Sequence, residues 1–164
     1  MLIKFFLGIA IVIFTSFCGY LLARKYRQRM LFFQEFCVFN ERFLSEIAYY
    51  RRPVKEFIAL YSYRGEFNDF LAEIFTVREE NLELESLFSK DKYTFLKEEE
   101  KKTLTDYFFM LGKGDSASQK GYFSSVKEKL LSMQKEAETQ AKRYGDLYIK
   151  IGFLCGLLIL ILIV

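Results

Sequence analysis

The feature that most constrains this chain is an apolar run near its start. Residues 5–23 form a stretch of 19 residues without a charged side chain, and basic residues follow it from Arg24 onward. At about 1.5 Å per residue, a helix of this length spans close to the ~30 Å hydrocarbon core of a bilayer. The alternative is a cleaved signal peptide, which also begins with a short basic segment. No A-x-A cleavage pattern is found, and Phe17 precedes Cys18 where a lipoprotein site needs a small residue, so an uncleaved membrane helix is the favoured prediction.

A second apolar run lies at the other end of the sequence. Residues 151–164 are fourteen apolar residues, and counting from Leu147 gives eighteen, with Lys150 able to reach the headgroups. A run of fourteen could instead be a buried core helix. No polar residue alternates within it, as a surface helix would require, and a second membrane helix is therefore predicted.

The positions of the basic residues predict how the chain is oriented in the membrane. They cluster on the inner side of both apolar runs, at Arg24, Lys25, Arg27, Arg29, Lys142, Arg143 and Lys150. The positive-inside rule then places the segment between the spans in the cytoplasm. The predicted organisation is a tail over 1–4, a membrane helix over 5–23, a cytoplasmic domain over 24–146 and a membrane helix over 147–164.

The cytoplasmic segment has the periodicity of helices. Apolar residues recur every three or four positions at Phe32, Phe36, Phe39, Phe43, Ile47 and Tyr50, and again at Val126, Leu130, Met133, Ala137 and Tyr144, with Gln140 as one polar lapse. The first membrane helix is expected to continue to about residue 50, since no Gly or Pro lies between Gly19 and Pro53. Further helices are expected at about 53–63, 67–77, 82–89, 93–111 and from 116 into the second span. Strand signals are nearly absent. The expected fold is all-α, a cytoplasmic antiparallel helical bundle flanked by N- and C-terminal transmembrane helices.

Two helix starts carry recognisable caps. Thr94 is expected to cap the helix at 93–111, and the pair Ser116 and Gln119 has the spacing of a capping box. The charged run 97–102 is interpreted as a solvated helix face. It belongs to the stretch 65–112, whose net charge of −6 either complements a basic partner or matches the basic ends of the bundle itself.

The composition argues against catalysis. There is no His, no nucleotide-binding loop and no metal-ligand motif, and the three Cys have no paired-Cys spacing. We therefore expect no catalytic, cofactor-binding or metal-binding residue and no enzymatic activity. The net charge of +3 is too small to indicate a nucleic-acid-binding protein.

Small residues recur within both apolar runs. Gly152 and Gly156 form a GxxxG pattern, and Gly19 and Ala23 continue a four-residue spacing that starts at Thr15. Such stripes let helix backbones approach closely in lipid. Gly19, Ala23, Gly152 and Gly156 are accordingly the helix-packing candidates.

Several short motifs together resemble one family. They are Gly152-Phe-Leu-Cys-Gly156 followed by aliphatic residues, Leu111-Gly112-x-x-Asp115-x-x-x-Gln119 with Ser116 inside it, Glu46-Ile47-x-Tyr49 with Pro53-Val54, and the start around Gly19, Ala23, Lys25 and Tyr26. This combination resembles the stage III sporulation protein AB family of endospore-forming bacteria, over the whole length of the chain. No motif matches over 65–100. The family is similar to the inner-membrane platform protein of type II secretion systems.

The resemblance implies a non-enzymatic component of the sporulation channel that links mother cell and forespore. Its expected partners are a secretion-type ATPase, stage III sporulation protein AA, and the other membrane subunits of the channel. Its expected location is the mother-cell membrane around the forespore. Membrane lipids and a second copy of the chain are further candidate partners. A small membrane-bound enzyme and a tethered adaptor of another secretion or division apparatus remain the alternatives.

Overall fold

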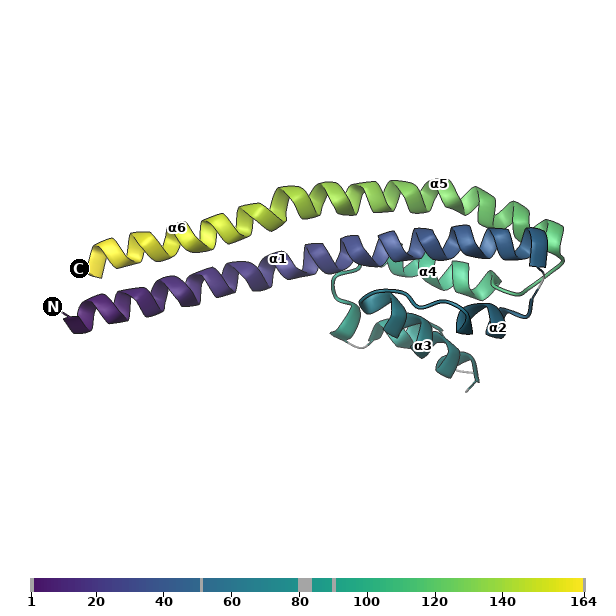
Figure 1. The fold of residues 1–164 in the computed structure, drawn as a ribbon, viewed down its shortest axis with the longest axis horizontal. Coiled ribbons are helices and arrows are strands. Elements are labelled where there is room, and N and C mark those ends of the chain that lie inside the picture. The colour runs from purple at the N-terminus through teal and green to yellow at the C-terminus, as the bar shows by residue number, and fades with distance from the viewer. Residues whose placement is uncertain (1, 51, 80–83, 90, 164) are drawn as a thin grey trace. The chain divides into compact units, whose positions relative to one another are not determined.

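The structure, a computed structural model, describes all residues except 1, 51, 80–83, 90 and 164, and most of the described residues are helical. No strand occurs among them, so the prediction of an all-α chain is confirmed. The elements are α1 (Leu2–Ser45), η1 (Glu46–Tyr50), α2 (Val54–Ala59), α3 (Glu66–Glu79), η2 (Leu84–Ser89), η3 (Asp91–Tyr93), α4 (Glu98–Met110), α5 (Ser116–Gln140), η4 (Ala141–Gly145) and α6 (Asp146–Ile163) (Figure 1). η1 and η4 are π-helical turns, and η2 and η3 are 3₁₀ helices.

The chain divides into two compact units. The terminal unit contains residues 1–30 and 136–164, and the central unit contains residues 31–135. These borders follow backbone packing, whereas the predicted borders at 24 and 146 follow the expected membrane surface.

In the terminal unit, the first part of α1 and the whole of α6 run antiparallel, with the two chain ends at the same end of the pair (Figure 1). Two helical stretches, Gly8–Tyr50 and Ser116–Leu162, are long and apolar enough to cross a membrane. The large apolar side chains of this unit are mostly exposed, as at Phe14, Leu158 and Leu162.

The core of the central unit is built from aromatic rings. The predicted face of α1 is buried at Phe32, Phe36, Phe39 and Phe43. The Phe36 ring packs edge-on against Tyr107 of α4, and the Phe43 ring packs against Phe123 of α5, with centroid separations of 4.8 and 4.9 Å. Edge-to-face pairs of this kind add stabilisation beyond the burial of their area.

The buried face of α1 ends earlier than its periodicity predicts. Ile47 is buried, but Tyr50 is 62% exposed. The reason is η1, because a π-helical turn takes more residues than an α-helical turn and so moves the following side chains off the buried face.

The cap predicted at Thr94 is wrong. Helix α4 begins at Glu98, and the carboxylate of Glu100 accepts a hydrogen bond from the backbone N–H of Lys97 at 2.8 Å. Glu100 is buried, so it also departs from the solvated face predicted for 97–102. A carboxylate in the first turn accepts a hydrogen bond from an unpaired backbone N–H group and is stabilised by the positive end of the helix dipole. Thr94 lies four residues before the first helical residue, Glu98, and so is too early to cap this helix.

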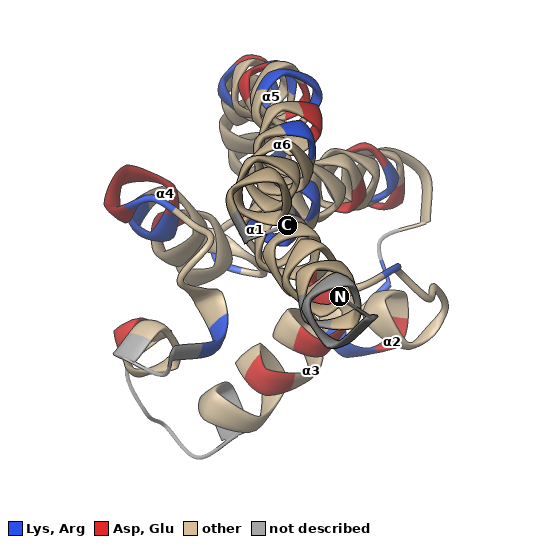
Figure 2. Cartoon of the chain, turned by 90° about the vertical axis from the view of Figure 1, so that its left-hand side faces the viewer, with Lys and Arg blue, Asp and Glu red and all other residues tan. Residues whose placement is uncertain are grey.

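The acidic stretch 65–112 is partly neutralised from within. Figure 2 shows acidic residues along α3 and a mixture of both signs on α4. Lys92 lies 2.8 Å from the carboxylate of Glu73 and 3.4 Å from that of Asp69, both on α3. The Tyr93 hydroxyl donates to the other oxygen of Glu73 at 3.1 Å. These contacts hold the segment 91–93 onto α3.

Candidate interaction site

A cavity of about 270 Å³ in the central unit brings together residues from two separate motifs. We refer to it as the motif pocket. Its lining consists of Phe43, Glu46, Ile47, Arg52, Pro53, Val54, Gly112, Ser116 and Gln119. Of the motif residues singled out in the sequence, Gly112, Ser116 and Gln119 therefore lie beside Glu46 and Pro53, more than fifty residues away along the chain.

A paired carboxylate forms one wall of the motif pocket. Glu46, the first residue of η1, is only 3% exposed. Its Oε1 atom accepts the backbone N–H of Arg52 at 3.2 Å and lies 3.5 Å from the Arg52 Nε atom. A buried charge requires such partners, because an uncompensated carboxylate away from water is strongly destabilising. The pair therefore ties the end of α1 to the segment that precedes α2.

A glycine-dependent turn contributes Gly112 to the lining. Leu111 has φ −63° and ψ 117°, Gly112 has φ +79°, and the Lys113 N–H donates to the Met110 carbonyl at 3.1 Å, which together define a type II turn. The third position of this turn requires a positive φ, and glycine adopts it without strain. A Cβ atom at Gly112 would also lie 3.1 Å from Val54 Cγ2. Leu111 is fully buried and anchors the turn in the core.

Helix α5 is capped one residue before the predicted position. Asp115 Oδ1 accepts the backbone N–H of Ser118 at 3.1 Å, while Ser116 is already the first helical residue. Bonds from Ser118 lower the pKa of the Asp115 carboxyl below its ordinary value of 3.8. Gln119 donates from Nε2 to the Gly114 carbonyl at 3.3 Å. The cap thus belongs to Asp115, because the turn before it leaves this residue, and not Ser116, at the helix boundary.

Exposed aromatic side chains adjoin the motif pocket along the chain. Tyr49 and Tyr50 belong to η1, which also supplies Glu46 and Ile47 to the lining. Tyr49 is 81% exposed, and the Arg52 guanidinium lies 4.7 Å from the Tyr50 ring centroid. Exposed tyrosine beside arginine is typical of protein-interaction surfaces.

The helix-packing candidates lie where α1 meets α6 within the terminal unit. A Cβ atom on Gly19 would lie 2.5 Å from the Tyr148 carbonyl oxygen, and one on Gly152 would lie 2.6 Å from the Thr15 carbonyl oxygen. A Cβ on Gly156 would overlap the Thr15 hydroxyl and lie 2.8 Å from Val12 Cα. Ala23 is buried one turn further along. The structure therefore brings the two small-residue stripes together within one chain.

One further small residue of this interface escaped the sequence reasoning. A Cβ on Gly8 would overlap the Leu160 side chain of α6. Gly8 lies seven residues before Thr15, so a search for heptad spacing, in place of four-residue spacing, would have found it.

A buried arginine explains the polar lapse at Gln140. Arg29 is 3% exposed, and its Nη1 atom donates to Gln140 Oε1 at 2.7 Å. Its Nη2 atom lies 3.4 Å from Glu136 Oε2, and Gln140 donates to the other carboxylate oxygen of Glu136 at 2.9 Å. All three residues belong to the terminal unit. The sequence predicted Arg29 only as a member of the basic cluster, because its partners are more than a hundred residues away along the chain.

Within the described part of the chain, no group of three His, Cys, Asp or Glu side chains is placed to hold a metal ion. Cys18, Cys37 and Cys155 are free thiols. Polar groups at the motif pocket stabilise backbone turns and helix ends.

The fold and the sites together define a class, namely an all-helical protein with two helices long and apolar enough to cross a membrane. The sequence model of one family, stage III sporulation protein AB, matches residues 4–164, nearly the whole chain. The chain belongs to this family, which supports a role in sporulation. No curated protein and no solved structure matches the chain.

Proposed function

We propose that this protein is a non-enzymatic membrane platform of the sporulation channel that links mother cell and forespore. Its two apolar helices would anchor it in the mother-cell membrane around the forespore, with the central unit in the cytoplasm. The family, the similarity of that family to the type II secretion platform and the basic residues beside both apolar runs support this proposal.

The observation that carries the proposal is the convergence of the motifs at one pocket. Glu46, Ile47, Pro53 and Val54 of one motif line the pocket together with Gly112, Ser116 and Gln119 of another. The exposed Tyr49 and Tyr50 follow Ile47 closely in the chain. Among the described residues of the lining, the one carboxylate is that of Glu46, and it is held in an ion pair with Arg52. Exposed aromatic residues that lie close in the chain to a pocket suit the docking of a protein partner.

The partner proposed for this surface is the secretion-type ATPase, stage III sporulation protein AA. The central unit would receive the soluble ATPase, and its conformational changes would pass through this protein to the other membrane subunits. Turnover of a substrate by the purified chain would overturn the non-enzymatic part of the proposal.

The test of this proposal is recovery of the ATPase with the detergent-solubilised chain from sporulating cells. The variant Tyr49→Ser/Tyr50→Ser should lose most of the recovered ATPase while its melting temperature is retained, because both side chains are exposed. The matched control is Leu60→Ser/Leu131→Ser, which changes two other exposed apolar residues of the central unit and should recover the ATPase normally. If the two variants recover the same amount of ATPase, the surface beside the motif pocket is not part of the interface.

The proposed orientation has a test of its own. Reporter fusions at both termini should report the side of the membrane opposite the cytoplasm. A cytoplasmic C-terminus would contradict this orientation, whatever the ATPase recovery shows.

A further inference from the structure

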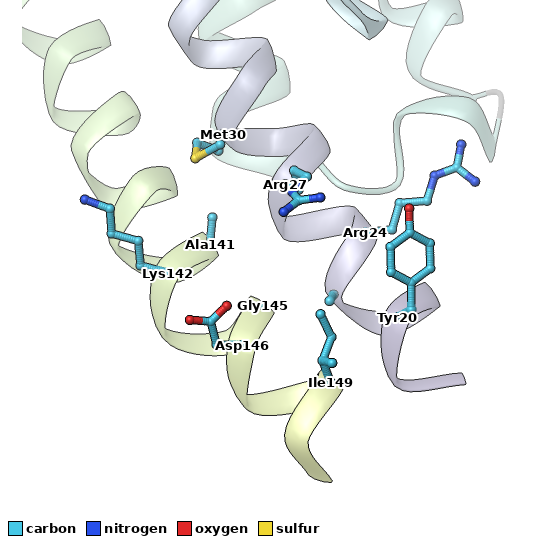
Figure 3. A pocket seen from close by; sticks show the side chains of 10 residues that line it. Tyr20, Arg24, Arg27, Met30, Ala141, Lys142, Gly145, Asp146 and Ile149 are labelled. Carbon is cyan, nitrogen blue, oxygen red and sulfur yellow. The ribbon is translucent and has the colours of Figure 1, made fainter. Parts of the chain in front are cut away.

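The terminal unit contains a second cavity, of about 320 Å³, between α1 and the start of α6. We refer to it as the basic pocket. Figure 3 shows Arg24 and Arg27 on α1, with Lys142 and Asp146 on the facing helix. Three cations and one carboxylate give the lining a net charge of +2 (3 − 1).

The local sequence explains why space is left here. Ala23 on one side and Ala141 and Gly145 on the other are the smallest residues of the lining. A Cβ atom at Gly145 would meet nothing within 4 Å. The π-helical turn η4 (Ala141–Gly145) widens the backbone at the same level.

The cations of the basic pocket are available for a ligand. Arg24, Arg27 and Lys142 are exposed, and among the described residues none of them has an ion-pair partner. Two neighbouring cations outside the lining, Lys25 and Arg143, instead lie close to aromatic rings. Lys25 lies 5.7 Å from the Tyr26 ring centroid, and the Arg143 guanidinium lies 5.6 Å from the Tyr144 ring centroid.

The basic pocket is also polarised along the helices. Tyr20 belongs to the charge-free run and Ile149 lies one turn inside α6, and both line the pocket on the apolar side of its cations. A ligand that fits this gradient carries an anionic group at one end and an apolar portion at the other. A free phosphate ion would use only the basic half.

We propose that the basic pocket binds the phosphate headgroup of an anionic phospholipid from the cytoplasmic leaflet. The inference rests on the proposed insertion of both apolar helices in the membrane. The guanidinium groups of Arg24 and Arg27 bind phosphate oxygens, Lys142 adds a third positive charge, and the acyl chains lie along Tyr20 and Ile149. The lipid then connects α1 to η4 at the membrane surface.

The test uses the full chain in detergent micelles, titrated separately with short-chain phosphatidylglycerol, short-chain phosphatidylcholine and inorganic phosphate. Phosphatidylglycerol should raise the melting temperature at concentrations where the other two have no effect. The variant Arg24→Gln/Arg27→Gln/Lys142→Gln should weaken this binding on the order of a hundredfold, because each cation in direct contact with the phosphate contributes about fivefold.

The matched control is Lys25→Gln/Arg143→Gln/Lys150→Gln, which removes the same charge from the terminal unit without touching the lining. It should retain the affinity for phosphatidylglycerol within about threefold, because its cations do not contact the bound phosphate and act only through screened attraction. Equal weakening in the two variants would show general attraction to anionic lipid and overturn the pocket. Equal stabilisation by inorganic phosphate would overturn the lipid as the ligand.

A separate measurement distinguishes failure of the pocket from failure of membrane insertion. After an alkaline carbonate wash, the chain and both variants should remain in the membrane fraction. Release by the wash would overturn the insertion on which this inference rests, whereas retention without a preference for phosphatidylglycerol would overturn the basic pocket alone.

Discussion

The two units use their apolar residues in opposite ways. In the central unit the large rings are inside, and Phe39 packs against Phe57, Phe67 and Phe108 with centroid separations of 5.5 to 5.8 Å. In the terminal unit the helices meet through glycine and backbone atoms, and Phe14 is 68% exposed. Burying rings stabilises a core in water, whereas close backbone contact with apolar side chains facing outward is favourable in lipid. The 52% hydrophobic content is therefore divided between a core of packed rings and two apolar helices that are long enough to cross a membrane.

The largest expected effect tests the aromatic core. Phe39→Ala should destabilise the central unit by about 3–5 kcal/mol, because a fully buried ring is removed and leaves a cavity. The measurement is denaturant unfolding followed by near-ultraviolet circular dichroism. The control is Phe14→Ala, which should leave the unfolding midpoint unchanged. A comparable loss of stability in both variants would mean that Phe14 is also buried.

The second prediction tests the glycine contact of the terminal unit. Gly152→Leu should separate α1 from α6 at a cost of about 1–3 kcal/mol, since even a Cβ atom there would lie 2.6 Å from the Thr15 carbonyl oxygen. Spin labels at the exposed positions Phe6 and Leu162, in a background without native cysteines, should move apart.

The control for this glycine contact is Gly145→Ala in the same unit. A Cβ atom at Gly145 has open space around it, so the distance between the spin labels should be unchanged. An unchanged distance in Gly152→Leu as well would contradict the packing of α1 against α6.

The third prediction concerns the polar contact of the terminal unit. Arg29→Met should cost about 1–3 kcal/mol, because Gln140 and Glu136 lose a buried donor. The double variant Arg29→Met/Gln140→Leu should cost less than the sum of the two single changes, by about 1 kcal/mol, measured as thermal unfolding in detergent. Strict additivity would show that the two side chains do not interact.

The smallest expected effect is a pH dependence at the start of α5. Because hydrogen bonds lower the pKa of Asp115 in the folded state, its contribution to stability is present above its ordinary pKa of 3.8 and is lost as the pH falls through the lowered value. Asp115→Asn preserves an N-cap that does not titrate. The wild type should therefore lose more of its melting temperature than Asp115→Asn when the pH falls below 3.8, and parallel curves would exclude this cap.

Local sequence patterns predicted most of the helices, but some of the predicted details were wrong. The burial of Phe32 to Phe43 followed from a spacing of three and four residues. Thr94 and Ser116 were wrong as caps by a few residues, because several neighbouring side chains were suitable and the tertiary turn selected one of them. Tyr50 was misplaced because the sequence gives no signal for the π-helical turn η1.

The candidate sites were only partly predictable for a related reason. Gly19 and Gly152 were found by their spacing, but their mutual contact depends on how α1 and α6 pack. The motif pocket and the basic pocket each combine residues that are distant in the chain. A pattern within one helix says nothing about the partner that it faces.

The sequence by itself determined the helical class, the two apolar runs and the family, because each follows from residue spacing or from motifs along the chain. Tertiary structure decided that Gln140 meets Arg29, that Glu46 pairs with Arg52 beside Gly112, and that Arg24, Arg27 and Lys142 share one cavity. The physical reason is range. Periodicity and capping act over a few residues, whereas a buried charge or a cavity exists only after distant segments have packed together.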